Sequence, residues 1–252
     1  MRIVLKFGSG ILANPKGNTL DQRQFQRLTT EVAESVKKGH QCIIVSSGAV
    51  AAGLGVLGLK ERPEDLAARQ ACAAIGQSKL MQLYSTMFGR HRLHVAQLLL
   101  THGDLDSRTR YDNARNTLER LFEQRSVVPI INENDSVAVE ELKFGDNDRL
   151  SAEVAMLARA DLLVLLTSTD GLLDSSGKTV RSVDNVDRVA GLVREQRGKF
   201  SVGGMTSKLQ AVKVAIDGGI HTHIASGRKA GQIGAIVAGK RAGTRFVPRG
   251  NG

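Results

Sequence analysis

Short runs of apolar, often β-branched residues alternate along the chain with longer stretches in which apolar residues recur every three or four positions. The short runs predict strands at 2–7, 41–46, 94–99, 127–132, 161–167, 220–225 and, more briefly, 244–247. Several of them are apolar almost without interruption, such as LLVLLT and VVPII. Such runs are typical of strands that are buried on both faces of a parallel sheet.

The longer stretches predict helices between the strands. The first is expected to begin at a capping box of Thr19 and Gln22 and to end before Gly39, since glycine commonly follows a helix. Further helices are predicted at 66–88, 113–123, 151–159 and 207–217, and a hairpin at 171–183 with its turn at 175–177. This alternation favours a three-layer α/β/α sandwich around a mostly parallel central sheet. No repeat or linker divides the chain, so we expect one domain over residues 1–252.

The composition is that of an ordinary globular protein. Of the 252 residues, 41% are hydrophobic and 24% are charged, which excludes a disordered or collagen-like chain. Cys42 and Cys72 are too few for a disulfide framework and are not a zinc-binding C-x-x-C pair, so a reducing compartment fits best. The N-terminal MRIVLKFGSG leaves no room for the apolar region of a signal peptide, and no stretch approaches the ~18 apolar residues of a membrane span. We expect a cytoplasmic protein without a membrane partner.

The chain is basic, with a formal net charge of +10, and no acidic residue follows Asp217. A basic excess is compatible with a solvated surface, an anionic small substrate or nucleic acid. Aromatic residues make up only 4% and tryptophan is absent, which argues against platforms that stack single-stranded bases.

Polar segments follow several of the predicted strands, at the edge of the sheet where ligands of open α/β folds bind. These segments are Gly8-Ser9-Gly10 after Lys6, Ser46-Ser47-Gly48, Asn132-Glu133-Asn134-Asp135 and Thr167-Ser168. A further loop holds Gly145-Asp146-Asn147-Asp148, and Gly203-Gly204-Met205-Thr206-Ser207-Lys208 is expected immediately before a helix. Amide groups and a lysine at a helix start can hold phosphate, although each segment alone is equally compatible with an ordinary turn.

Two lysines and a carboxylate could together perform phosphoryl transfer. Lys6 lies in an otherwise apolar strand, where a lysine needs a charged partner, and Lys208 stands at a helix start. A carboxylate from Asp135, Asp146 or Asp148 between them would hold both ammonium groups in place and charged. Phosphoryl transfer mainly requires such positioning and charge neutralisation.

Other site types are disfavoured. The G-x-G-x-x-G string at 53–58 begins too far after its strand for a dinucleotide site, and no Walker A string occurs. The 145–148 loop lacks the glutamate of an EF-hand, and the histidine pairs have no acidic or thiol neighbour, so we expect no protein metal site. No G-x-S-x-G elbow supports a serine hydrolase.

Taken together, six strings resemble the amino-acid kinase family, and within it the branch that phosphorylates the γ-carboxylate of L-glutamate at the start of proline biosynthesis. The strings are LKFGSG, VSSGAVAAG, INENDSVAV, FGDNDRLSA, GGMTSKLQAV and IASG, and they occur in family order over essentially the whole chain. Two of these strings, INENDSVAV and FGDNDRLSA, together separate this branch from acetylglutamate, aspartate, carbamate and uridylate kinases.

The resemblance implies the amino-acid kinase fold, ATP and Mg²⁺ as cofactors, and γ-glutamyl phosphate as product. It implies that Lys6 and Lys208 neutralise the migrating phosphoryl group and that Asp148 organises them. It assigns glutamate to Ser47, Asp135 and Asn147, with Asn132 beside them. Expected nucleotide contacts are Lys6, Gly8, Thr167, Ser168, Val202, Gly203, Gly204, Met205, Thr206, Ser207 and Lys208.

Two departures from the family pattern are visible. The family commonly has Thr-Asp where this chain has Thr167-Ser168. Many members also carry a C-terminal PUA-type module, which we expect this chain to lack. The resemblance further implies inhibition by proline with 136–144 as a lid, a homodimer or homotetramer, transfer of the product to glutamyl phosphate reductase, and no nucleic-acid partner. Two alternatives stay open: another acyl-phosphate-forming kinase, such as N-acetylglutamate kinase, and a basic nucleic-acid-binding or regulatory protein on the same scaffold.

Overall fold

A single sheet forms the centre of the molecule in the computed structural model, which describes residues 1–138, 146–187, 189 and 202–248. Its strands are β1 (Arg2–Phe7), β2 (Gln41–Ser46), β3 (His94–Leu100), β4 (Val127–Glu133), β5 (Leu162–Thr167), β6 (Ser182–Val183), β7 (His221–Ser226) and β8 (Thr244–Phe246). They are arranged in the order β3-β4-β2-β1-β5-β7-β8-β6. The strands from β3 to β7 in this order are parallel, and β8 pairs antiparallel with β7.

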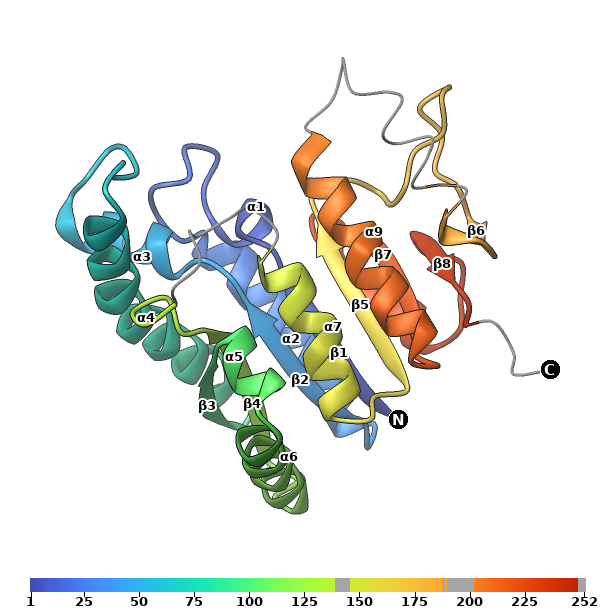
Figure 1. Ribbon diagram of the computed structural model, residues 1–252, viewed down its shortest axis with the longest axis horizontal. Coiled ribbons are helices and arrows are strands. Elements are labelled where there is room, and N and C mark those ends of the chain that lie inside the picture. Colours follow the sequence, from blue (N-terminus) through green and yellow to red (C-terminus); the bar gives the residue numbers. More distant parts are fainter. Residues whose placement is uncertain (139–145, 188, 190–201, 249–252) are drawn as a thin grey trace.

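Helices cover both faces of the sheet (Figure 1). They are α1 (Ser9–Leu12), α2 (Gln22–Lys37), α3 (Ala49–Leu57), α4 (Leu66–Gly89), α5 (His102–Asp106), α6 (Arg108–Glu123), α7 (Asp146–Leu157), α9 (Val202–Asp217) and α10 (Gln232–Val237). One core cluster joins the sheet to α6, α7 and α9, and a second joins it to α1, α2, α4 and α10. The predicted three-layer sandwich is therefore confirmed.

The alternation of side chains along β1 decides which layer each residue contacts. Val4 belongs to the core cluster on the α7 and α9 face, whereas Ile3, Leu5 and Phe7 belong to the cluster on the α2 face. Because successive side chains of a strand point to opposite faces, Lys6 shares the face of Val4. The lysine is thereby directed toward α7 and α9.

Most of the predicted elements are confirmed, including β1 and β2 at their full length and the hairpin, which is closed by a bridge between Leu173 and Thr179. Gly39 follows α2 with a φ of +86°. The capping box of Thr19 and Gln22 was wrong. The side chain of Asp21 caps α2 by accepting from the amide of Gln24, since Asp21 stands directly before the first helical residue.

Helix α3 could not be predicted from the sequence, because its residues AVAAGLGVL show no apolar periodicity. The helix packs against α4 at very short range. A Cβ atom on Gly53 would lie 1.9 Å from the carbonyl oxygen of Cys72, and one on Gly76 would lie 1.8 Å from that of Ala49. The two backbones are therefore in direct contact, and this contact fixes α3, which begins directly after Ser47 and Gly48.

Both cysteines are buried, as the strand and helix patterns around them predicted. Burial raises the pKa of Cys42 to about 12, so this thiol stays protonated and behaves as a small apolar side chain. Among the described residues, no helix is both long and apolar enough to cross a bilayer.

Candidate active site

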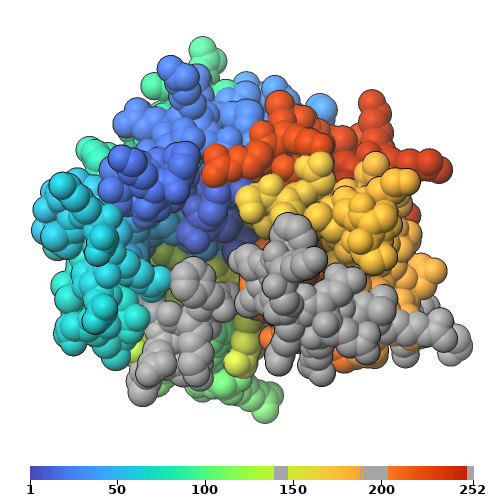
Figure 2. Space-filling view, turned by 90° about the horizontal axis from the view of Figure 1, so that it is seen from above, coloured from blue at the N-terminus to red at the C-terminus, as the bar shows by residue number. Residues whose placement is uncertain are grey.

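A cleft of about 650 Å³ opens at the carboxyl ends of β1, β2, β4 and β5. The chain passes from β1 to β2 on one side, while β5 pairs with β1 on the other, so the cleft lies at the topological switch point of the sheet. Figure 2 looks down on this edge and shows a hollow bordered by the blue N-terminal residues and by the cyan residues of the α3 and α4 region. The cleft therefore lies at the edge of the sheet where the sequence predicts the site.

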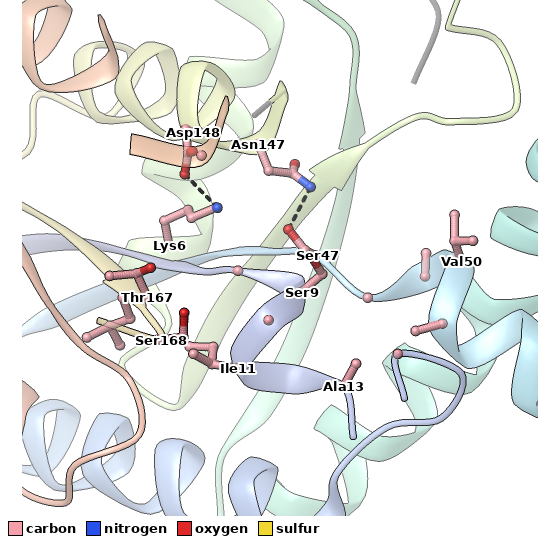
Figure 3. A pocket seen from close by; sticks show the side chains of 18 of the residues that line it. Lys6, Ser9, Ile11, Ala13, Ser47, Val50, Asn147, Asp148, Thr167 and Ser168 are labelled. Carbon is pink, nitrogen blue, oxygen red and sulfur yellow. Dashed lines mark hydrogen bonds and ion pairs between the residues drawn. The ribbon is translucent and has the colours of Figure 1, made fainter. Parts of the chain in front are cut away.

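Asp148 lies between two lysines in the centre of the cleft. Lys6 Nζ is 2.6 Å from Oδ1 of the carboxylate, and Lys208 Nζ is 3.1 Å from Oδ2 (Figure 3 shows the first pair). Ser207 also donates its hydroxyl to Oδ2 at 2.9 Å. Exposed fractions of 7% for Lys6, 12% for Lys208 and 1% for Asp148 show that bulk water scarcely reaches the group.

Three separate elements bring this group together. Lys6 is the last but one residue of β1, Asp148 lies in the first turn of α7, and Lys208 lies in the second turn of α9. The backbone carbonyl of Gly204, one turn earlier in α9, accepts from Lys208 Nζ at 2.9 Å and fixes its direction. Ser151 donates to the backbone carbonyl of Asp148 at 2.6 Å and holds the start of α7.

The charges of this group depend on one another. Burial alone would raise the pKa of Asp148, but Lys6, Lys208 and the hydroxyl of Ser207 together hold it below its ordinary value. Burial lowers the pKa of Lys6, the nearby Lys208 lowers it further, and Asp148 opposes both effects. The carboxylate is therefore held in its ionised form between the two lysines, at a place from which water is largely excluded.

A chain of amide side chains lies on one side of the lysines. Asn147 Nδ2 donates to Ser47 Oγ at 3.0 Å and to Asn132 Oδ1 at 3.2 Å, and Asn132 Nδ2 donates to Gln77 Oε1 at 2.8 Å. Figure 3 shows Asn147 and Ser47 facing each other beside Lys6. Ser47 follows β2 and Asn132 is the last residue but one of β4, so neighbouring parallel strands bring them to one edge.

Asp135 and Arg62 also line the cleft. Burial lowers the pKa of Arg62, the neighbouring Arg69 adds to this, and Asp135 opposes it. An acidic and a basic side chain therefore lie near each other in the wall of the cleft. Such a combination suits a ligand that carries both charges.

The opposite end of the cleft is formed by different residues. Thr167 ends β5 and Ser168 follows it, and Figure 3 places both on the far side of Lys6 from Asn147 and Ser47. Gly8 also lines this part, and the side chain of Arg228 donates to the carbonyl oxygen of Gly10. The cleft thus has room for two ligands that meet at the lysines.

Most of the residues singled out from the sequence come together here. Those that line the cleft are Lys6, Gly8, Ser47, Asn132, Asp135, Asn147, Asp148, Thr167, Ser168, Gly204, Met205, Ser207 and Lys208. Thr206 is not among them, because it lies on the opposite side of α9 from Gly204. The surroundings of Val202 and Gly203 are outside what the structure describes, and so are residues 139–144 of the lid predicted at 136–144.

Two local predictions were wrong. The segment 203–208 is part of α9 rather than the approach to it, and Asp146 to Asp148 begin α7 rather than forming a loop. In both cases glycines or short polar residues at a helix start resemble a turn when only the sequence is seen. The sequence analysis also missed Gln77 and Arg62, which lie in α4 and in the preceding loop, away from any strand end.

The chain is similar to known proteins over most of its length. The model of the amino acid kinase family matches residues 1–226. A glutamate 5-kinase of Moorella thermoacetica is 46% identical over 257 residues, covering 98% of this chain and 67% of the relative. One of Clostridium acetobutylicum is 41% identical over 255 residues, covering 98% of this chain and 95% of the relative.

Two solved structures share the fold. UMP kinase of Bacillus anthracis superposes with a TM-score of 0.64 at 14% identity, covering 98% of this chain and 96% of the other. N-acetylglutamate synthase of Neisseria gonorrhoeae, complexed with coenzyme A and L-arginine, gives a TM-score of 0.69 at 13% identity, with coverage of 98% and 61%. At this identity the likeness concerns the fold alone.

Proposed function

The chain belongs to the amino acid kinase family, and on that premise we propose that it transfers the γ-phosphoryl group of ATP to the γ-carboxylate of L-glutamate. This is the reaction of a glutamate 5-kinase and the first step of proline biosynthesis from glutamate. The observation that carries the proposal is the carboxylate of Asp148 between Lys6 and Lys208. The printed names of the relatives, at 46% and 41% identity, support the choice of substrate.

The chemistry of this transfer needs no general base. The γ-carboxylate of glutamate is ionised at neutral pH, so one of its oxygens attacks the γ-phosphorus directly. The bond from that phosphorus to the bridging oxygen breaks, and ADP leaves with the electron pair. The protein must therefore position the two ligands and neutralise the charge of the transferred group. Asp148 suits this role, because both of its oxygens are engaged by lysines and its lowered pKa makes it a poor base.

We place glutamate at the end of the cleft with the acidic and amide side chains. Asp135 pairs with the α-ammonium group, and Ser47, Asn147 and Asn132 provide further hydrogen bonds to the substrate. In this orientation the γ-carboxylate would extend toward Lys6, which Figure 3 shows beside Asn147 and Ser47. The proposal is supported by the lining of the cleft, to which Ser47, Asn132, Asp135 and Asn147 all contribute.

We place ATP at the other end, on Gly8, Thr167, Ser168 and the 202–208 segment of α9. Among the described residues there is no group of three or more His, Cys, Asp or Glu side chains that could cage a metal ion. We infer that Mg²⁺ arrives bound to the phosphates of ATP and keeps most of its water. The ion would neutralise charge on the triphosphate, while Lys6 and Lys208 contact the group in transfer.

The reaction can be tested directly. Purified protein is incubated with ATP, Mg²⁺ and glutamate, ADP formation is followed by a coupled assay, and hydroxylamine traps the acyl phosphate as a hydroxamate. We expect ADP and hydroxamate in equal amounts, both dependent on glutamate, and little turnover of N-acetylglutamate, which lacks the ammonium group for Asp135. ADP formation that does not respond to glutamate would reject the proposal.

Several further properties follow from the same assignment. We propose that proline inhibits the enzyme, that the enzyme assembles as a homodimer or homotetramer in the cytoplasm, and that its product passes to glutamyl phosphate reductase. We also propose that residues 1–252 act as a single kinase domain. The support for these points is the family to which the chain belongs.

A further inference from the structure

Gln77 of α4 ends the chain of amides that begins at Asn147. Its Oε1 accepts from Asn132 Nδ2 at 2.8 Å, and Asn132 Oδ1 in turn accepts from Asn147 Nδ2 at 3.2 Å. Gln77 is half-buried, and it is not one of the residues that line the cleft. Among the residues that the structure describes, Asn132 links it to the site.

The hydrogen bonds within this chain permit two directions. A primary amide exchanges its oxygen and its nitrogen when it turns by half a rotation about its last bond. If Gln77, Asn132 and Asn147 all turned together, every bond between them would form again with donor and acceptor exchanged. Ser47 could follow, because a hydroxyl both donates and accepts. The direction of these hydrogen bonds decides which atom of the Asn147 amide stays available to a ligand, the oxygen Oδ1 or the nitrogen Nδ2.

The structure shows one of these directions. Asn147 uses Nδ2 for both Ser47 and Asn132, and its Oδ1 is buried without a hydrogen-bond partner among the described residues. A buried acceptor without a donor is costly, so a ligand that supplies a donor gains from binding there. At neutral pH the carboxylates of glutamate only accept hydrogen bonds. Its α-ammonium group is the one donor that it offers.

We propose that Gln77 is a positioning residue for glutamate specificity. By accepting from Asn132, it holds the chain in the direction in which Asn147 presents Oδ1 to the substrate's ammonium group. This inference rests on the function proposed above, since it assumes that glutamate occupies the end of the cleft with the amide chain. It adds a residue of α4, outside the cleft, to those that recognise the substrate.

The test uses two variants that differ in what they offer Asn132. Gln77→Met keeps the length of the side chain and removes both polar atoms, so we expect the KM for glutamate to rise about tenfold. The KM for ATP and kcat should change less than about threefold. Gln77→Glu offers only acceptors, which preserves the observed direction, so its KM for glutamate should stay within about threefold of the wild type. Gln82→Met, on an exposed position of the same helix, is the matched control.

Two outcomes would overturn the inference: an unchanged KM for glutamate in Gln77→Met, or a Gln77→Glu variant as impaired as Gln77→Met. The double variant Gln77→Met/Asn132→Ala adds a readout that a merely structural role would not give. Its KM should equal that of Asn132→Ala alone, because Gln77 acts through Asn132. If the wild type forms no glutamate-dependent hydroxamate, the proposed function itself fails. If it does and the variants behave otherwise, only the role of Gln77 is rejected.

Discussion

Lys6 of β1 and Asp148 of α7 form an ion pair of 2.6 Å in which 7% and 1% of the two side chains are exposed. An ammonium group held so far from bulk water is poorly screened, and it therefore acts strongly on any negative charge that approaches it. The free energy that burial costs is offset here by the carboxylate. Lys208 receives the same support from the other oxygen of Asp148.

Removing either lysine should mainly slow the chemical step. We expect Lys6→Ala and Lys208→Ala each to lower kcat by roughly 10²–10³, with a much smaller rise in the KM for glutamate, because one preorganised positive charge is lost from the transition state. Lys213→Ala, on an exposed position of α9, should leave kcat unchanged. Steady-state kinetics of the three variants decides the matter. A wild-type kcat in both Lys6→Ala and Lys208→Ala would remove the lysines from the mechanism.

Asp148→Asn should destabilise the fold as well as reduce activity, because two buried ammonium groups lose their partner. We expect the free energy of unfolding at pH 7 to fall by about 3–5 kcal/mol. The folded-state pKa of Asp148 lies below its unfolded value, so its contribution is complete above about pH 5 and is lost as the pH falls through the folded-state pKa. Denaturant titrations at pH 7, 5 and 3.5 should thus show a constant gap to the wild type that narrows only at the lowest pH. A gap that closes between pH 7 and 5 would contradict this assignment.

Asp135→Asn should weaken glutamate selectively. The variant keeps the shape of the side chain but loses the charge that pairs with the α-ammonium group, so the KM for glutamate should rise at least tenfold while the KM for ATP stays nearly constant. Asp170→Asn, whose carboxylate pairs with Lys229 at the surface, serves as a control. An equal loss of affinity for both substrates would indicate that Asp135 holds the metal–nucleotide complex instead.

The contact between α3 and α4 predicts opposite effects for two glycines of the same helix. Gly76→Ala would place a Cβ atom 1.8 Å from the carbonyl oxygen of Ala49, so we expect a loss of stability of more than about 2 kcal/mol. It should also raise the KM for glutamate, because α3 begins directly after Ser47 and Gly48. Gly89→Ala meets no atom within 4 Å and should be neutral or stabilising by up to about 1 kcal/mol. Thermal unfolding of both variants tests the pair, and similar melting temperatures would refute the close approach.

Proline should compete with glutamate. It has the ammonium and carboxylate groups that Asp135 and its neighbours are proposed to bind, but it has no γ-carboxylate to phosphorylate. Titrating proline at several glutamate concentrations should raise the apparent KM for glutamate, and Asp135→Asn should lose sensitivity to proline along with affinity for glutamate. Inhibition that excess glutamate does not relieve would place proline elsewhere.

The strands and the position of the site could be predicted because both depend on local patterns. A strand buried on two faces appears as an unbroken apolar run, and the carboxyl ends of parallel strands meet at one edge. Lys6 could be recognised for the same reason, since a charged residue in such a run needs a partner.

The contributions of the helices were harder to predict. Nothing in the sequence shows that Gln77 lies against Asn132, which is 55 positions away, because their contact depends on how α4 packs on the sheet. The helix α3 was missed because contact between two backbones selects small residues, and these produce no apolar stripe. The start of α9 was misplaced because glycines are more often found in turns than in helices.

The alternation of faces along β1 also restricts which changes of length the gene can accept. Inserting or deleting one residue within the strand would reverse the side to which every following residue points. Lys6 would then face the apolar cluster around Leu5 and Phe7, on the α2 side of the sheet, and Asp148 would lose its partner. Insertions and deletions of a single codon should therefore be eliminated from this strand during evolution and should be left out of any engineered library, whereas the turns that follow the helices at Gly39 and Gly219 can vary more freely.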